Sequence, residues 1–202
     1  RVRVMAKASA GMVSTTASAM DAVGEWMRRN PAAAQIDSID NFHQDAGYLS
    51  ALAASINAHW MDYGRPEKLL MSFHGLPKIS VARGDPYYGQ CLESGRRLAS
   101  ELGLAEPDYV ITFQSRFGPA EWLQPYTQTT LEALGRQGVR RVDAVCPGFV
   151  SDCLETLEEI AMECKAAFIA AGGQEFRYIP CLNERHEWIE ALAALVKGHL
   201  PD

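Results

Sequence analysis

The sequence predicts an α/β fold: a doubly wound, four-stranded parallel sheet flanked by helices, preceded by a partial amino-terminal lobe and a linker helix. Two observations lead to this prediction. From about residue 67 onward, short apolar runs alternate with helical patterns at a period of about 35 residues, which is typical of βα units and a parallel sheet. Glycines also stand at 103, at 135 and 138, and at 172 and 173, where each expected helix must turn back toward the sheet.

The predicted strands are short apolar runs, at 68–73, 108–113, 141–146 and 175–179. The predicted helices span 85–103, 121–136, a long stretch from Ser151 or Asp152 to about 171, and 184–199. Asp85 is expected to cap the first of these helices, with Pro86 at its first position. A side-chain acceptor there binds unpaired N–H groups, and proline lacks an N–H that would otherwise be unpaired.

The first 66 residues show a different pattern. We expect a helix over about 16–29, a strand within 35–42 and a helix over about 45–63, whereas residues 1–14 show no usable period. This segment looks like the last βα turn of another lobe followed by a connecting helix. We therefore expect two parts: residues 1–66, a remnant of an amino-terminal lobe with a connecting helix, and residues 67–202, a carboxyl-terminal lobe.

Bulk composition narrows the classes of function. Of 202 residues, 48% are hydrophobic and 22% charged, and the formal net charge is −6. An acidic chain without a Lys/Arg run argues against a nucleic-acid partner, which needs a basic face. No apolar stretch approaches the roughly 20 residues that span a bilayer, and the first 20 residues lack a signal-peptide core. We expect a cytoplasmic protein and leave peripheral contact with a membrane open.

The cysteines form no disulfide framework, because their number is odd and no C-x-x-C pair occurs. We expect free thiols in a reducing compartment, most of them acting as small core residues. A 2Fe–2S cluster held by distant cysteines is the alternative, and it is not expected here. The five are Cys91, Cys146, Cys153, Cys164 and Cys181.

In open α/β sheets, ligands bind beyond the carboxyl ends of the strands, and His74 stands at the end of the first predicted strand. Imidazole is a common metal ligand and moves protons near neutral pH. A histidine at a strand end can equally be a hydrogen-bonded structural residue. Gly75 and Pro77 favour the functional interpretation, because they would form a tight turn that holds the ring in place.

Two further segments follow strand ends. Arg116 and Trp122 come after the second strand, and a cation beside an aromatic ring suits a flat anionic ligand; an ordinary surface loop is the alternative. After the third strand, Asp152, Glu155 and Glu159 are spaced i, i+3 and i+7, so on one α-helix they would share a face. Such a row could conduct a divalent cation or form part of a solvated acidic face.

At these positions the sequence resembles the ferrochelatases. The similarity is carried by S-F-H-G-L-P at 72–77, G-D-P-Y at 84–87, Q-S-R-F-G-P at 114–119 with W-L at 122–123, and P-G-F-V-S-D-C-L-E-T-L-E-E at 147–159, in the family's order and spacing. It also takes in 41–60 and weakly reaches Thr15. Ferrochelatases are lyases of haem biosynthesis that insert ferrous iron into protoporphyrin IX to form protohaem. Two similar doubly wound lobes enclose the porphyrin, so 67–202 would be the carboxyl-terminal chelatase lobe.

The resemblance implies roles for several residues. His74 and Glu155 match the family's paired metal- and proton-handling residues and are the expected catalytic pair. Asp152 and Glu159 match the acidic row that leads away from that pair, so these four residues form the expected metal site. Ferrous iron would be the substrate metal and protoporphyrin IX the other substrate. Cys153 departs from the pattern, because some members carry histidine there.

The resemblance also predicts the porphyrin contacts, for which Arg116, Trp122 and Phe149 are the candidates. Because the two lobes of the resembled enzyme cover each other, the 202-residue chain alone should expose Phe117, Trp122 and Phe149 and should self-associate to cover them.

Three functions remain open from the sequence. The chain is a ferrochelatase, a related tetrapyrrole chelatase that uses cobalt or nickel, or a non-catalytic porphyrin- or metal-binding lobe. The metal that is inserted separates the first two, and binding without turnover identifies the third. Whether protoporphyrin or coproporphyrin is the substrate also remains open.

Overall fold

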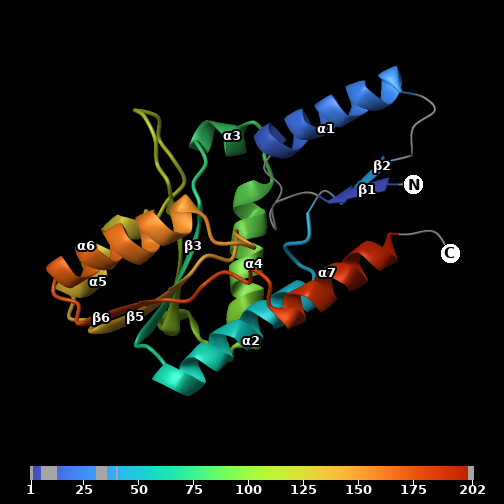
Figure 1. Ribbon diagram of the computed structural model, residues 1–202. Coiled ribbons are helices and arrows are strands. Elements are labelled where there is room, and N and C mark those ends of the chain that lie inside the picture. The colour runs from blue at the N-terminus through green and yellow to red at the C-terminus, as the bar shows by residue number, and fades with distance from the viewer. Residues whose placement is uncertain (1, 6–12, 31–35, 40, 200–202) are drawn as a thin grey trace.

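The centre of the protein is a four-stranded sheet in which every neighbouring pair of strands is parallel, in the order β4-β3-β5-β6 (Figure 1). The computed structural model describes residues 2–5, 13–30, 36–39 and 41–199. The strands are β3 (Lys68–His74), β4 (Tyr109–Gln114), β5 (Arg141–Val145) and β6 (Glu175–Tyr178). Each lies within a residue or two of the apolar run that predicted it, so the predicted fold class is confirmed.

Helices cover both faces of this sheet. On one side lie α5 (Thr127–Arg136), the π-helix η2 (Glu155–Cys164) and α6 (Lys165–Ala170), and on the other lie α2 (Ala46–Tyr63) and α4 (Tyr87–Glu101) (Figure 1). Side chains alternate between the faces of a strand. In β3, Leu69, Met71 and Phe73 join the core under α2 and α4, whereas Leu70 joins the core under α5 and η2. By the same alternation, His74 faces the side of α5 and η2.

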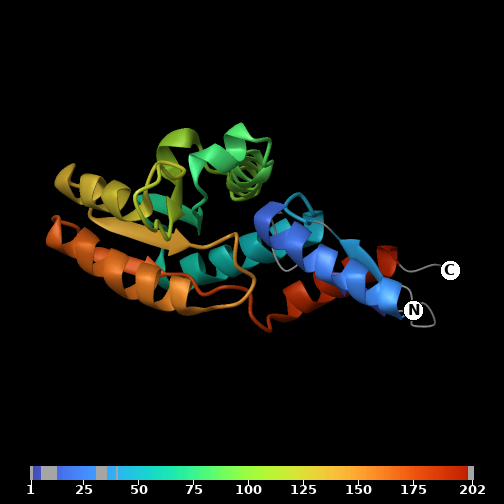
Figure 2. The same cartoon turned by 90° about the horizontal axis from the view of Figure 1, so that it is seen from above.

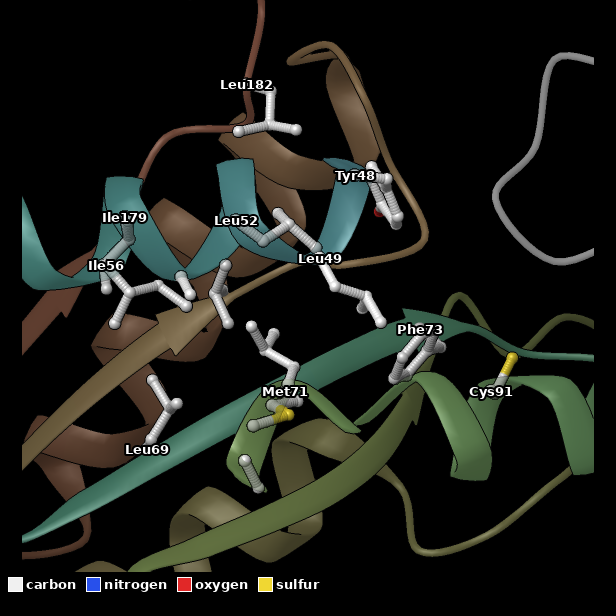
Figure 3. Close-up of a cluster of buried hydrophobic side chains, with 14 of the residues drawn as sticks. Tyr48, Leu49, Leu52, Ile56, Leu69, Met71, Phe73, Cys91, Ile179 and Leu182 are labelled. Carbon is white, nitrogen blue, oxygen red and sulfur yellow. The ribbon is translucent and has the colours of Figure 1, made fainter. Parts of the chain in front are cut away.

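The helix α2 is part of the core of this lobe. Its Leu49, Leu52 and Ile56 point toward Leu69 and Met71 of β3 (Figure 3). Burying each such side chain stabilises the fold by about 1.5–3 kcal/mol. The helix predicted as a connector therefore also supports the sheet, while the division of the chain at residue 66 stays a prediction.

The last helix, α7 (His186–Gly198), packs along α2, where the rings of Trp188 and Tyr48 lie 5.5 Å apart. Asp45 caps α2 by accepting a hydrogen bond from the Tyr48 N–H at 2.8 Å. None of the helices in the described ranges is both long enough and apolar enough to cross a membrane.

The amino-terminal elements lie beside α7, away from the four-stranded sheet (Figure 2). The strands β1 (Val2–Met5) and β2 (Ile36–Ile39) pair in parallel, and α1 (Val13–Arg29) lies between them in the sequence. The predicted helix over 16–29 and the strand within 35–42 are found, although residues 35 and 40 lie outside the described residues. The pattern of residues 1–14 predicted no strand, and β1 corrects that omission.

The helices predicted over 85–103, 121–136 and 184–199 all begin later than the sequence indicates. The helix expected over 121–136 begins at Thr127, because the preceding residues run along the ends of β3 and β4 instead. There the Leu123 N–H donates to the Leu76 carbonyl and the Phe113 N–H donates to the Pro125 carbonyl, both at 2.9 Å. Proline also disfavours helix at the residue before it. The helix expected over 85–103 begins at Tyr87, whose N–H donates to the Asp85 carboxylate at 2.9 Å.

The predicted long helix, capped by Ser151 or Asp152 and running to about 171, is found within about two residues of its predicted ends but is wrong in type. Helical structure begins at Leu154, the stretch Glu155–Cys164 is a π-helix, and α6 continues to Ala170. A π-helix bonds each N–H to the carbonyl five residues earlier, and such segments occur frequently at functional sites. Two short helices that were not predicted, α3 (Lys78–Ala82) and η1 (Glu106–Asp108), complete the chain.

Candidate functional site

The candidate site lies at the carboxyl edge of the sheet, where β3 ends at His74. His74 pairs in register with Gln114, the last residue of β4. The neighbour of β3 on the other side is β5, and the chain that leaves β5 enters the π-helix at Glu155. Because parallel strands end at the same edge, these three chain segments meet at one place. The expectation that the first and third predicted strands are neighbours is confirmed.

The backbone around His74 fixes the tautomer of its ring. His74 is half-buried, and its Nδ1 lies 2.7 Å from the Gly75 carbonyl oxygen. A carbonyl oxygen only accepts, so Nδ1 carries the proton and the lone pair of the neutral ring is on Nε2. The Tyr87 hydroxyl donates to the His74 carbonyl at 2.9 Å. The Gly75 carbonyl thus holds the imidazole and Tyr87 holds the backbone of His74, with Nε2 as the nitrogen that can accept a proton or a metal.

Glu155 begins the π-helix and is half-buried. A hydrogen bond from the Cys153 thiol lowers its pKa most, followed by a backbone hydrogen bond, whereas burial raises the pKa and the charge of His74 lowers it by the smallest amount. Glu155 is therefore a carboxylate at neutral pH. The chain segments that carry these two predicted residues meet at Gln114, which pairs with His74 in register and donates to the Glu155 carbonyl.

Glu159 is bound to the end of β4. Its two carboxylate oxygens accept from the Ser115 N–H and from the Ser115 hydroxyl, both at 2.6 Å. Ser115 has a φ of 62°, a left-handed conformation that is uncommon for residues other than glycine. The two hydrogen bonds hold Ser115 in this conformation and keep Glu159 beside Gln114.

Asp152 does not share a helix face with Glu155 and Glu159, so that prediction is wrong. It precedes the helix, and its carboxylate accepts from the Tyr178 hydroxyl at 2.6 Å and from the Asn183 side-chain amide at 2.7 Å. Burial alone would raise its pKa, but these hydrogen bonds together lower it. Within the described residues, no group of three or more His, Cys, Asp or Glu side chains is arranged to hold a metal ion.

The predicted porphyrin contacts surround the same edge. Phe149 faces His74, with ring centroids 6.4 Å apart. Trp122 is half-buried, and its Nε1 donates to the Phe117 carbonyl at 2.8 Å. Of the three side chains expected to be exposed, Phe117 is 84% exposed, whereas Trp122 and Phe149 are only partly exposed.

Arg116 is exposed and lies over the Tyr126 ring, 5.1 Å from its centroid. It lines a cavity of about 300 Å³ together with Ser115, Thr127 and Glu159. A hollow of about 490 Å³ lies elsewhere, between α2 and residues 179–185, and neither His74 nor Glu155 lines it. The charged cavity therefore adjoins the candidate site, and the larger hollow does not.

The ferrochelatase family model matches residues 2–200 of this chain. The chain belongs to the ferrochelatase family. Among curated ferrochelatases, it is 57% identical to that of Azoarcus sp. (strain BH72) over 92% of this chain and 51% of the relative. It is 56% identical to that of Aromatoleum aromaticum over 94% and 52%, and 54% identical to that of Bordetella pertussis over 93% and 52%. The chain thus spans about half the length of the curated relatives it matches.

A solved structure agrees in fold. CbiX, described as the terminal enzyme for biosynthesis of siroheme in denitrifying bacteria, matches with a TM-score of 0.54 over 88% of this chain and 69% of its own. The identity is 19%, so this likeness supports the chelatase-like fold alone.

Three residues that support the candidate site were not predicted as site residues from the sequence. Tyr87 bonds the His74 carbonyl, the Cys153 thiol bonds Glu155, and Gln114 connects β4 to the π-helix. The position of Gln114 was the available signal, because a polar residue at the end of a buried strand lies at the ligand-binding edge of the sheet.

Proposed function

We propose that this protein inserts ferrous iron into protoporphyrin IX to form protohaem, with His74 and Glu155 at the reacting centre. The observation that carries the proposal is geometric: the strand end with the half-buried His74, whose Nε2 bears the lone pair, and the helix start with the half-buried Glu155 carboxylate meet at Gln114. Membership of the ferrochelatase family supports this assignment.

The two side chains suit the chemistry of insertion. As the metal ion enters, two pyrrole N–H bonds break, two protons leave and four metal–nitrogen bonds form. Nε2 of His74 can take one proton, and the Glu155 carboxylate can take the second or hold the arriving metal ion. Partial burial strengthens both interactions, because water screens them less.

The remaining residues have proposed roles around this pair. Arg116 would hold a porphyrin carboxylate, while Trp122 and Phe149 would lie against the ring. Asp152 and Glu159 would form the route by which ferrous iron arrives or protons leave. Both carboxylates already accept hydrogen bonds, so the arriving metal ion or proton would have to replace those hydrogen-bond donors. The expected cytoplasmic location and any peripheral membrane contact rest on the sequence alone.

The direct test is metal insertion by the protein at its full natural length. Free protoporphyrin or coproporphyrin is incubated anaerobically with Fe²⁺ or Zn²⁺, and the metalloporphyrin is followed by its absorbance. The His74→Ala variant should lose on the order of 100-fold or more in turnover, as expected for a positioned proton acceptor. His186→Ala is the matched control, because that ring pairs with Glu190 on an exposed helix surface. Near-normal turnover in His74→Ala would defeat the assignment.

A non-catalytic porphyrin-binding lobe is the second candidate, and one observation favours it for the 202-residue chain: it spans about half the length of its curated relatives. Porphyrin fluorescence quenching by this chain without metal insertion would support that candidate. Insertion of cobalt or nickel in preference to iron would instead indicate a related tetrapyrrole chelatase.

A further inference from the structure

A buried chain of hydrogen bonds leads from the interior of the sheet to the candidate site. The hydroxyl of Ser72 donates to Gln114 Oε1 at 2.7 Å and lies 2.8 Å from the Thr127 hydroxyl. The hydroxyls of Thr127 and Thr112 lie 2.9 Å apart. All four side chains are at most 3% exposed. A connected buried network of this kind rigidifies its members and holds each in one orientation.

Gln114 is the member of this network that reaches the π-helix. Because its Oε1 accepts from Ser72, its amide nitrogen is turned the other way. That Nε2 donates to the Glu155 carbonyl at 2.7 Å and lies 3.5 Å from the Glu159 carboxylate. The side chain of Gln114 therefore holds the first residue of the π-helix, which is also the predicted catalytic carboxylate.

The backbone of Gln114 holds the other half of the catalytic pair. Its carbonyl accepts from the Gly75 N–H at 2.7 Å, immediately after His74. Gln114 also pairs with His74 in the β3–β4 register. One residue thus connects the strand end that carries His74 with the helix start that carries Glu155.

We propose that Gln114 is a positioning residue that sets the separation of Glu155 from His74. The inference rests on the proposed function, because it assigns Gln114 to the same reaction. Gln114 supplies no proton acceptor and no metal ligand in the proposed reaction, and its amide acts on Glu155 through the backbone carbonyl of that residue. Displacing a reacting group by about 1 Å can cost on the order of 100-fold in rate, so losing this tether should lower kcat far more than it changes the KM for porphyrin.

Gln114→Met tests the tether, because methionine keeps the length of the side chain and removes the hydrogen bonds of the amide, including the one to the Glu155 carbonyl. Thr112→Val is the matched control: it deletes a fully buried hydroxyl of the same network that does not touch Gln114. Ser72→Ala is a milder second variant that removes the hydrogen bond to Oε1 and leaves the Glu155 contact in place. Steady-state kinetics are measured on the protein at its full natural length, and hydrogen–deuterium exchange is measured over residues 154–164.

The expected result for Gln114→Met is a kcat lower by about 100-fold, a porphyrin KM within about threefold of the original, and faster exchange at the start of the π-helix. Thr112→Val should keep kcat within about threefold of the original value, even if it loses as much stability as Gln114→Met. If Gln114→Met does not fold, Ser72→Ala tests the inference instead. Its kcat is expected to fall further than that of Thr112→Val.

An unchanged kcat in Gln114→Met would overturn the inference. Equal kcat losses in Gln114→Met, Ser72→Ala and Thr112→Val at equal stability would also overturn it, because they would show a purely structural role. An original protein that inserts no metal would refute the proposed function and this inference with it. An active original protein with a normal Gln114→Met variant would refute this inference alone.

Discussion

Gly75 lies where the strand end that carries His74 is most tightly enclosed, so Gly75→Ala should be strongly destabilising. A Cβ at this position would lie 2.5 Å from the Gln114 carbonyl oxygen and 3.0 Å from Cε3 of Trp122. The Gln114 oxygen belongs to β4 and accepts the Gly75 N–H at 2.7 Å, so it cannot retreat without lengthening that hydrogen bond. Overpacking costs about 1–3 kcal/mol, and a weakened hydrogen bond adds about 0.5–1.5 kcal/mol. We expect a loss of about 2–4 kcal/mol in the free energy of unfolding.

Urea denaturation of the 202-residue chain measures this loss, with Gly89→Ala as the control. Gly89 lies on the exposed side of α4, and its added Cβ would meet no atom within 4 Å. Alanine favours a helix interior over glycine by about 0.5–1 kcal/mol, so this variant should be more stable than the original. Equal behaviour of the two variants, or an unaltered midpoint in Gly75→Ala, would refute the packing argument.

Three further outcomes follow from the structure. Asp143→Ala should lower the free energy of unfolding by about 3–5 kcal/mol, because it removes the buried carboxylate that pairs with the mostly buried Arg177. Glu67→Ala breaks an exposed pair and should cost under about 1 kcal/mol. Similar losses for the two variants in urea denaturation would contradict this expectation. The pKa of Asp152 is lower in the folded protein than in the unfolded chain. Its carboxylate therefore stabilises the fold at pH values above its unfolded pKa of about 3.9, and this stabilisation is lost as the pH falls through the lower folded pKa. The stability gap between the original and Asp152→Asn should therefore narrow from pH 6 to about pH 2, and a widening gap would be contrary to it. The isolated chain, with Phe117 84% exposed, should self-associate in light scattering and do so less as Phe117→Ser; a strict monomer at high concentration would refute this expectation.

The central strands β3 and β5 were predictable because they are buried on both faces of a parallel sheet. Such strands read as short continuous apolar runs bounded by turn residues, and Leu69 to Phe73 is an example. The start of α5 was not predictable, because residues 121–126 are held by hydrogen bonds to the backbone of Leu76 and Phe113. Those partners are distant in the sequence, and local helical patterning contains no signal for them.

The two proposed reacting groups could be named from the sequence, whereas the residues that support them could not. His74 and Glu155 stand out by residue type and by their positions after strands. The π-helical turn that sets the direction of Glu155 has ordinary helix-forming residues, so its local pattern predicts an α-helix. Gln114 contacts Glu155, which is 41 residues away in the sequence. Its amide reaches that residue only because of the register in which β3 and β4 pair. Asp152 is separated from Glu155 and Glu159 because it precedes the helix and accepts hydrogen bonds from Tyr178 and Asn183.

A double-mutant cycle between His74 and Glu155 tests the central claim most directly. The values of kcat for metal insertion are compared among the original protein, His74→Ala, Glu155→Gln and the double variant, all at full natural length. Residues that act as one unit in a reaction show strongly non-additive losses. We predict that the double variant is scarcely slower than the slower single variant. Losses that multiply, or a single variant with near-normal turnover, would contradict a shared catalytic centre.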